Sequence, residues 1–202
     1  ACSTNVIKGN YIGIDKNGTT FITGSTQDYG VYITSSAGGN TIGGSGANEG
    51  NVISGNKDAG TTARGVFSNS TAAAGNIILG NIIGPQADGV TYLTSNGQYS
   101  GIEISGSQNN TIGGNTAGAR NIISANEFYG VYLNGAACST NVVKGNYIGI
   151  DQSGTTFITG SAQDYGVFLT ASASGNTIGG SGAGEGNVIS GNKNAVSTAI
   201  GI

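Results

Sequence analysis

The chain has 202 residues, of which 39 are Gly, one is Pro and none is His, Met or Trp, and its net charge is −3. Gly without a strict three-residue period excludes collagen, and the low charge with abundant Ile, Val and Thr excludes a disordered chain. No apolar run reaches the length of a membrane-spanning helix, and the few basic residues are scattered, which argues against a nucleic-acid surface.

Short segments with alternating apolar residues recur along the chain, separated by clusters of Gly, Asn and Ser. This period of two residues between turn residues predicts strands of about four to six residues. No stretch has the apolar stripe of a helix. In chain order the segments are NVIKGN from Asn5, GVYI from Gly30, NTIGG from Asn40, NVISGN from Asn51, GVFS from Gly65, NIILGN from Asn76, GIEI from Gly101, NTIGG from Asn110, NIISAN from Asn121, GVYL from Gly130, NVVKGN from Asn141, GVFL from Gly166, NTIGG from Asn176 and NVISGN from Asn187.

The chain is an internal duplication. Residues 1–66 reappear as residues 137–202 at an offset of 136, with conservative changes such as Ile7 to Val143. Inside this offset the Gly-led segments recur every 29 to 36 residues. We therefore predict one repeat domain over residues 1–202, made of a super-repeat at 1–136 and a partial second copy at 137–202.

One repeat with three or so short strands cannot bury its own apolar side, whereas stacked repeats can pair each strand with its counterpart. We therefore predict an all-β, right-handed parallel β-helix of about six coils of 29–36 residues. A β-propeller or a β-sandwich is the alternative, although the aromatic signatures of propeller blades are missing.

Alternation assigns the buried positions and the turns. The side chains expected to point inward are Val31, Ile33, Ile102, Ile104, Val131, Leu133, Val167 and Leu169 after the glycines, and Ile7, Ile42, Ile53, Ile78, Ile112, Ile123, Val143, Ile178 and Ile189 after the asparagines. Ser68 takes one of these inward positions, which predicts a weaker core or a local adjustment there. Asn at a turn can bond its own backbone and its stacked neighbours. The predicted Asn ladder consists of Asn5, Asn40, Asn51, Asn76, Asn110, Asn121, Asn141, Asn176 and Asn187.

Aromatic residues gather at outward positions. Tyr32, Phe67, Glu103, Tyr132 and Phe168 should form one outward column, with Tyr29, Tyr99, Tyr129 and Tyr165 beside it. Outer aromatic residues often mark contacts. Three interpretations stay open: self-stacking or cover by loops, a protein interface, or a carbohydrate platform. The possible contact face consists of Tyr29, Tyr32, Phe67, Tyr129, Tyr132, Tyr165 and Phe168.

The two cysteines, Cys2 and Cys138, occupy the same repeat position four coils apart. At about 4.8 Å per coil they lie ~19 Å apart, too far for a disulfide within one chain. Each is therefore either a small buried residue or half of an inter-chain disulfide. The segments from Asp15 and Asp151 resemble the start of a calcium loop, but they lack its further acidic ligands. A plain turn is favoured over a metal site.

The phrases GVYITSSAGGNTIGG, GNVISGN and NYIGID resemble right-handed parallel β-helix repeats of the pectate-lyase-like superfamily. They are most similar to the Asn- and Gly-rich, NosD-like repeats of large bacterial and archaeal surface proteins. The resemblance covers nearly the whole chain and is specific for the fold. It implies little about activity, because the superfamily includes lyases, hydrolases, adhesins and structural proteins.

A catalytic site should be a unique constellation, but the acidic residues are mostly copied with the repeat, as Asp15 is in Asp151 and Glu49 is in Glu185. We identify no catalytic residue, metal site or cofactor. The leading hypothesis is a structural segment of an extracellular or cell-surface filament, sheath or adhesin, with itself or other surface proteins as partners.

The first alternative is a β-helix that binds or cleaves a carbohydrate. The second is an ice-binding solenoid, against which the unequal coil lengths argue. Both ends of the chain interrupt a coil, which suggests either a segment of a longer protein or a subunit completed by its neighbour.

Overall fold

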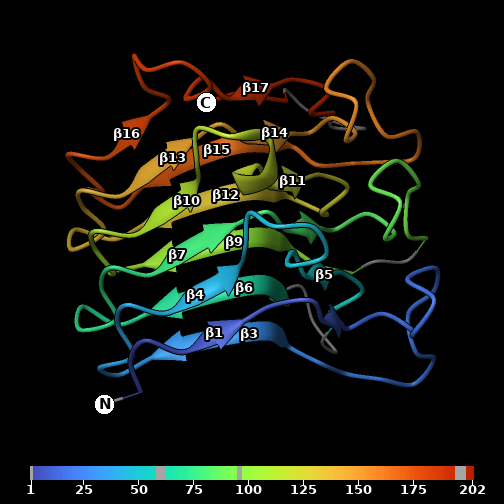
Figure 1. The fold of residues 1–202 in the computed structure, drawn as a ribbon, viewed down its shortest axis with the longest axis horizontal. Helices are drawn as coiled ribbons and strands as arrows, with labels where there is room; N and C mark the ends of the chain where they lie inside the picture. Colours follow the sequence, from blue (N-terminus) through green and yellow to red (C-terminus); the bar gives the residue numbers. More distant parts are fainter. Residues whose placement is uncertain (1, 58–61, 95–96, 194–198) are drawn as a thin grey trace.

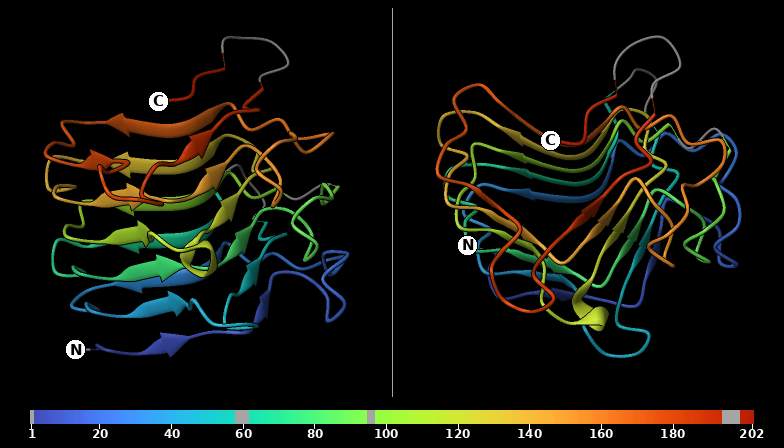
Figure 2. Two further views of the ribbon diagram at one scale, coloured as in Figure 1. Left: turned by 45° about the horizontal axis from the view of Figure 1, so that its top comes forward. Right: turned by 90° about the horizontal axis from the view of Figure 1, so that it is seen from above.

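A stack of parallel coils makes up the protein (Figure 1). The computed structural model describes residues 2–57, 62–94, 97–193 and 199–202. The strands form three parallel sheets, as in a right-handed β-helix of about six coils. The predicted fold class is confirmed. Seen along the stack, the three sheets enclose one interior and the longer loops project outside it (Figure 2).

Each sheet takes one strand from successive coils. The first sheet contains β1 (Val6–Ile7), β4 (Thr41–Gly43), β7 (Ile77–Leu79), β10 (Thr111–Gly113), β13 (Val142–Lys144) and β16 (Thr177–Ile178). The second contains β2 (Tyr11–Ile12), β5 (Val52–Ile53), β8 (Ile82–Ile83), β11 (Ile122–Ile123), β14 (Tyr147–Ile148) and β17 (Val188–Ile189). The third contains β3 (Tyr29–Thr34), β6 (Arg64–Asn69), β9 (Ser100–Ser105), β12 (Tyr129–Asn134) and β15 (Tyr165–Thr170). A short 3-10 helix, η1 (Ala117–Ala119), lies between β10 and β11.

We number the coils from the Asn that precedes each strand of the first sheet. Coils 1 to 6 begin at Asn5, Asn40, Asn76, Asn110, Asn141 and Asn176. Pairing between coils is parallel and places equivalent residues together. Ile42, for example, is paired with Ile7 in coil 1 and with Ile78 in coil 3.

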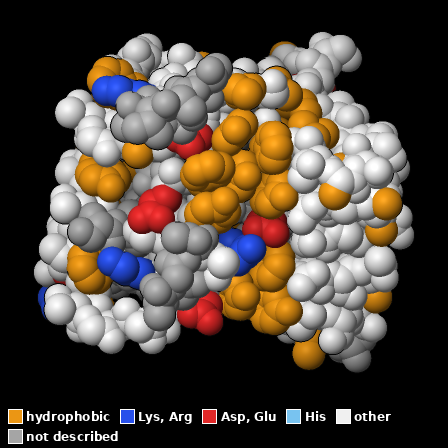
Figure 3. Space-filling view, turned by 180° about the vertical axis from the view of Figure 1, so that it is seen from behind, with side chains coloured by type: hydrophobic (Ala, Val, Ile, Leu, Met, Phe, Trp, Pro, Cys, Tyr) orange, Lys and Arg blue, Asp and Glu red, His pale blue; other side chains and the backbone are white. Residues whose placement is uncertain are grey.

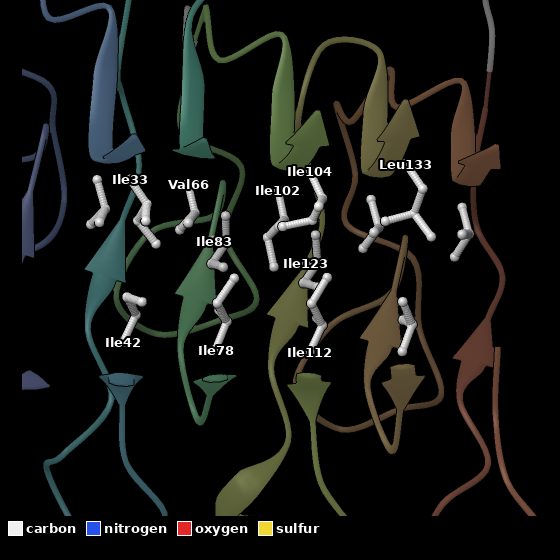
Figure 4. Close-up of a cluster of buried hydrophobic side chains, with 14 of the residues drawn as sticks. Ile33, Ile42, Val66, Ile78, Ile83, Ile102, Ile104, Ile112, Ile123 and Leu133 are labelled. Carbon is white, nitrogen blue, oxygen red and sulfur yellow. The ribbon is translucent and has the colours of Figure 1, made fainter. Parts of the chain in front are cut away.

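The interior is a stack of aliphatic side chains (Figure 4). All the residues predicted to point inward belong to this core, and Ile12, Ile83 and Ile148 of the second sheet join them. Full burial of one such side chain stabilises the fold by about 1.5–3 kcal/mol. Ser68 is buried among them, and its hydroxyl lies 3.1 Å from the hydroxyl of Ser107. The local adjustment is therefore a hydrogen bond between neighbouring coils.

Stacked asparagines form two ladders where the sequence predicted one. In each ladder, the side-chain NH2 of one Asn donates to the side-chain oxygen of the Asn in the next coil. The first ladder precedes the first sheet and contains Asn5, Asn40, Asn76, Asn110, Asn141 and Asn176. The second precedes the second sheet and contains Asn10, Asn51, Asn81, Asn121, Asn146 and Asn187. The same oxygens also accept backbone N–H groups, as Asn110 Oδ1 does from Asn76 at 2.9 Å.

A third ladder alternates Asn with Gln and lies just before the third sheet. Its members are Asn56, Gln98, Asn126, Gln163 and Asn192, joined by side-chain bonds of 2.7–3.0 Å. Because this ladder contains both Asn and Gln, a search of the sequence for repeated Asn does not find it. A row of amides thus accompanies each of the three sheets.

The unequal coil lengths arise in the loops, not in the sheets. Coil 1 joins β2 to β3 through residues 13–28, whereas coil 4 joins β11 to β12 through residues 124–128 only. The longer loops fold over the outer side of the second sheet, where Ile14, Val52 and Leu93 form a second buried cluster. The strand register is therefore the same in long and short coils.

The ladders yield a first prediction. Asn110→Ala removes the acceptor of Asn76 and two donated bonds from the fully buried Asn110. Because buried groups are left without partners, we expect the free energy of unfolding to fall by about 2–4 kcal/mol in denaturant titration. Asn115→Ala, at an exposed position of the same coil, is the control and should change it by less than ~0.5 kcal/mol. Equal effects of the two substitutions would contradict the role of the ladder.

Candidate contact face

The predicted contact residues lie on the outer side of the third sheet. Figure 3 shows this side, where apolar side chains gather in a band that runs along the stack. The strand register confirms the outward column of Tyr32, Phe67, Glu103, Tyr132 and Phe168. The column beside it contains Tyr29, Arg64, Ser100, Tyr129 and Tyr165. Ser100, and not Tyr99, is paired with Tyr129 in the register, but the ring of Tyr99 lies beside that column, 5.4 Å from the ring of Tyr129.

Most rings of the band pack against one another. Tyr129 is the centre of the upper part: its ring lies 4.5 Å from that of Tyr132 and 5.2 Å from those of Tyr165 and Phe168. Tyr99 stacks on Phe128 at 5.1 Å. Ring pairs at such separations contribute about 0.5–1.5 kcal/mol beyond their buried area. The upper part of the band is therefore a packed aromatic cluster outside the core.

The lower part of the band contains Tyr29, Tyr32 and Phe67, whose ring centroids lie 5.0–5.5 Å apart. Phe67 is buried, and Tyr32 keeps 48% of its surface exposed. A sugar ring stacks on a flat, open aromatic face, and here many of those faces already contact other rings. A protein contact and a carbohydrate platform stay predictions for this face, with Tyr32 its most open aromatic residue among those described.

An ion pair lies between the two parts of the band. Arg64 Nε donates to Glu103 Oε2 at 2.6 Å, and the two side chains are 16% and 4% exposed. The guanidinium lies over Phe67, 4.8 Å from the ring centre, and donates to the carbonyl of Thr62. Position 64 becomes Ile200 in the second copy, so this pair is not copied at that position. It neutralises the one carboxylate of the aromatic column.

The phenols of the band resist ionisation. Burial, followed by the nearby Tyr99, raises the pKa of Tyr129 above its ordinary value. Burial and the carboxylate of Glu103 likewise raise the pKa of Tyr132. Both phenols therefore stay neutral at physiological pH, and the band carries little charge apart from the pair of Arg64 and Glu103.

The copied acidic residues bind parts of the fold itself. Lys8 contacts Glu49 at 2.7 Å, and Lys144 contacts Glu185 at 2.8 Å at the same place in the second copy. Hydrogen bonds from Lys8 and the backbone N–H of Gly46 lower the pKa of Glu49. Because these pairs are open to solvent, water and salt screen them and they contribute little to stability.

The loop that begins at Asp15 is a turn closed by its own carboxylate. Asp15 Oδ1 accepts the backbone N–H groups of Thr19 and Thr20 at 2.7 and 3.0 Å, and these bonds lower the pKa of Asp15. Asp151 closes the equivalent turn, where its Oδ1 accepts the hydroxyl of Ser153 at 2.6 Å and the backbone N–H of Thr156 at 3.4 Å. Within the described part of the chain, no group of three or more His, Cys, Asp or Glu side chains could hold a metal ion. None of its helices is long and apolar enough to cross a membrane.

The two cysteines differ in environment. Cys2 is exposed and Cys138 is buried, and neither forms a disulfide. Cys138 belongs to the core, where its thiol contacts the side chain of Asn141. An inter-chain bond needs an accessible thiol, so it stays a prediction for Cys2, whereas Cys138 fits the alternative of a small buried residue.

Sequence reasoning missed two features of this face. It did not identify Arg64 as the partner of Glu103. A lone carboxylate in an otherwise aromatic column could have signalled a cation one coil away, because a buried charge needs a counter-charge. It also overlooked Phe128, which precedes β12 and packs against Tyr99, Tyr129 and Tyr165.

Comparison with protein-family models, curated proteins and solved structures finds no match to this chain.

The ion pair yields a second prediction. Glu103→Phe leaves Arg64 without its counter-charge in a mostly buried place, so we expect a loss of about 3 kcal/mol in unfolding free energy. The double variant Arg64→Tyr, Glu103→Phe continues both aromatic columns and should recover most of that loss. A double-mutant cycle by denaturant titration measures the coupling. Additive effects of the two substitutions would show that the side chains do not act as a pair.

The cysteines yield a third prediction. Burial raises the pKa of Cys138 to about 11, and its side chain is shielded, so a thiol reagent should not modify it in the folded protein. We expect one reactive thiol per folded chain and two in denaturant, with Cys2→Ser reducing the counts to none and one. Rapid modification of Cys138 in the folded Cys2→Ser variant would contradict its burial.

Proposed function

We propose that this chain is a structural repeat segment of an extracellular or cell-surface filament, sheath or adhesin. It associates with itself or with other surface proteins through the edges of its coils or through its lateral faces. It acts by holding a rigid shape, and no chemical step is assigned to it.

The observation that carries this proposal is the structural use of the copied charges. The pairs of Lys8 with Glu49 and of Lys144 with Glu185 join successive coils at equivalent places in the two copies. The carboxylates of Asp15 and Asp151 likewise close equivalent turns. Acidic residues with such partners are poorly suited to proton transfer or metal binding, whereas they suit a shape repeated along an array.

Stiffness is the second support. Bonds along the amide ladders run parallel to the stack, together with the backbone bonds of three sheets. The first two ladders link every coil to the next, and the third links coils 2 to 6. Bending the stack would stretch the bonds of the rows on its convex side and compress those on its concave side. A solenoid of this construction therefore resists bending, as a surface fibre or sheath requires.

Two kinds of surface are available for association. Strands at the edge of a sheet present unpaired N–H and C=O groups that can pair with another strand. The aromatic band offers a lateral apolar face, with Tyr32 as its most exposed ring among the described residues. The resemblance to NosD-like repeats of the pectate-lyase-like superfamily agrees with a surface protein, and membership of that superfamily is part of the proposal.

Ice binding has less support. The unequal coil lengths do not argue against it, because the sheets keep their register in long and short coils. The outer column of the first sheet is nevertheless not a uniform Thr array. Thr41, Thr111 and Thr177 alternate with Val6, Ile77 and Val142.

The test is assembly of the purified protein, followed by electron microscopy and sedimentation velocity over a range of concentrations. We expect rods longer than one stack, or lateral bundles, in amounts that grow with concentration. Tyr32→Ser should weaken lateral bundles, whereas Asn115→Ala, an exposed control, should not.

A polysaccharide degradation assay, with and without calcium, tests the main alternative. Particles that stay monomeric at every concentration and degrade a polysaccharide would overturn the structural function. Assembly without degradation would support it.

A further inference from the structure

Two kinds of coil alternate along the stack and differ in their outer loops. In odd coils the two ladder residues are close, as with Asn5 and Asn10, and a long loop follows the second sheet. In even coils the two ladder residues are farther apart, as with Asn40 and Asn51, and the additional residues form a segment that we call the flap. The long loops are residues 13–28, 84–94 with 97–99, and 149–164, and the flaps are residues 44–50, 114–120 and 180–186.

The flaps touch one another across the odd coil that separates them. Gly118 in the flap of coil 4 lies so close to Ser45 in the flap of coil 2 that a Cβ on Gly118 would overlap the Ser45 carbonyl oxygen. Gly184 in the flap of coil 6 lies equally close to the carbonyl of Asn115. Each flap therefore occupies the height of two coils, about 9.6 Å at the ordinary strand spacing.

The long loops are also in contact across one intervening coil. The backbone N–H of Ala87 in coil 3 donates to the carbonyl of Gly18 in coil 1 at 2.9 Å. The N–H of Gln152 in coil 5 donates to the carbonyl of Gly89 in coil 3 at 3.0 Å. The long loops of coils 1, 3 and 5 therefore form a continuous column outside the second sheet, although coil 4 joins β11 to β12 through residues 124–128 only.

In coils 3 and 5 the short turn between the first and second sheets fills the space between two flaps. In coil 3 this turn contains Gly80, whose N–H donates to Ala119 in the flap above at 3.2 Å. Its backbone has a φ of 70°, and a Cβ there would overlap the carbonyl oxygens of both Gly44 and Gly118. The turn around Gly145 in coil 5 has the same environment, between Gly114 and Gly184. Coils 3 and 5 therefore fit only between two even coils.

From these contacts we infer that the assembly unit of this solenoid is a pair of coils, odd then even, and that the upper surface of each pair accepts only the lower surface of another such pair. The core repeats every coil, but the outer layer repeats every two. Removing a single coil would bring two flaps or two long loops, which already touch at two-coil spacing, to half that separation. An array of this kind can change its length only in steps of two coils. This goes beyond the proposed function, because it rests on the loop contacts alone.

Internal deletions test the inference, because the residues before the ladder asparagines of coils 2 to 5 share a left-handed backbone. These residues are Gly39, Gly75, Asn109 and Thr140, with φ of 69°, 72°, 57° and 56°. Deletion of residues 76–140 removes coils 3 and 4, and deletion of residues 40–109 removes coils 2 and 3. Both keep the alternation. Deletion of 76–109 or of 110–140 removes one coil and places two even or two odd coils in contact.

Far-UV circular dichroism and thermal unfolding of the four variants give the readout. The deletions of 76–140 and of 76–109 remove Glu103 and keep Arg64, so both variants also carry Arg64→Tyr to avoid a buried guanidinium without its counter-charge. We then expect the two pair deletions to unfold cooperatively, with Tm within about 5 °C of the full chain. The single-coil deletions, although they remove about half as many residues, should lose cooperativity or lower Tm by more than about 10 °C.

Steric overlap of the flaps can also be tested by shortening one of them. In the variant lacking residues 76–109, replacing the flap of coil 4 by the short Lys144-Gly145 turn of coil 5 should restore cooperative unfolding. Single-coil deletions as stable as the pair deletions would overturn the inference. Pair deletions that fail to fold would overturn it equally.

Discussion

The buried amide is the group on which the rest of this structure depends. Asn81 and Asn121 are fully buried, and an amide without hydrogen-bond partners costs free energy inside a protein. Here each amide finds its partner in the equivalent residue of the next coil, at 2.9–3.0 Å. Such a bond forms only when equivalent residues lie directly above one another. Three rows of these bonds therefore impose the register that the aliphatic and aromatic columns follow.

The inner and outer parts of the molecule follow different periods. The strands, the amide rows and the aliphatic core repeat with each coil, because a strand is one strand spacing high. The flaps and long loops are thicker than a strand, and they fit only by alternating between coils. The same interior is thus compatible with two kinds of outer segment, the flaps and the long loops. The near-identity at an offset of 136 residues corresponds to four coils, which are two odd and two even coils.

Much of the fold could be predicted because the information is local. Alternation along four residues identifies Ile42 or Ile112 as inward whatever lies elsewhere in the chain. Asn51, Asn121 and Asn187 were predicted as ladder residues, but their separation into a second ladder and the existence of the third were missed for physical reasons. Asn10 and Asn81 belong to phrases already assigned to the first ladder, and Gln98 replaces Asn with a longer amide that reaches the same partners. The alternation of flaps was missed because a loop's thickness becomes visible only when coils are stacked.

The contact face could be predicted in part. Outward alternation located Tyr32, Tyr132 and Phe168, but the environment of each ring depends on residues from other coils. Tyr99 and Phe128 come from the segments that lead into the strands, where alternation gives no guide. Arg64 was missed because its role is defined by Glu103, one coil away. Self-association and location at the cell surface are proposals, and they rest on the roles of individual side chains more than on the fold.

The pairing of Arg64 with Glu103 has a consequence for how the chain folds. Coils this similar can mispair during folding, since a segment of one copy resembles the segment four coils away, and repeat proteins misassemble by such errors. Solenoids fold by adding neighbouring coils in sequence. A chain that skipped coil 3 would bury Arg64 beside a ring and leave Glu103 without a cation. That mismatch would destabilise the stack with the wrong order of coils. One ion pair that is not repeated therefore distinguishes the middle coils from the other, similar coils.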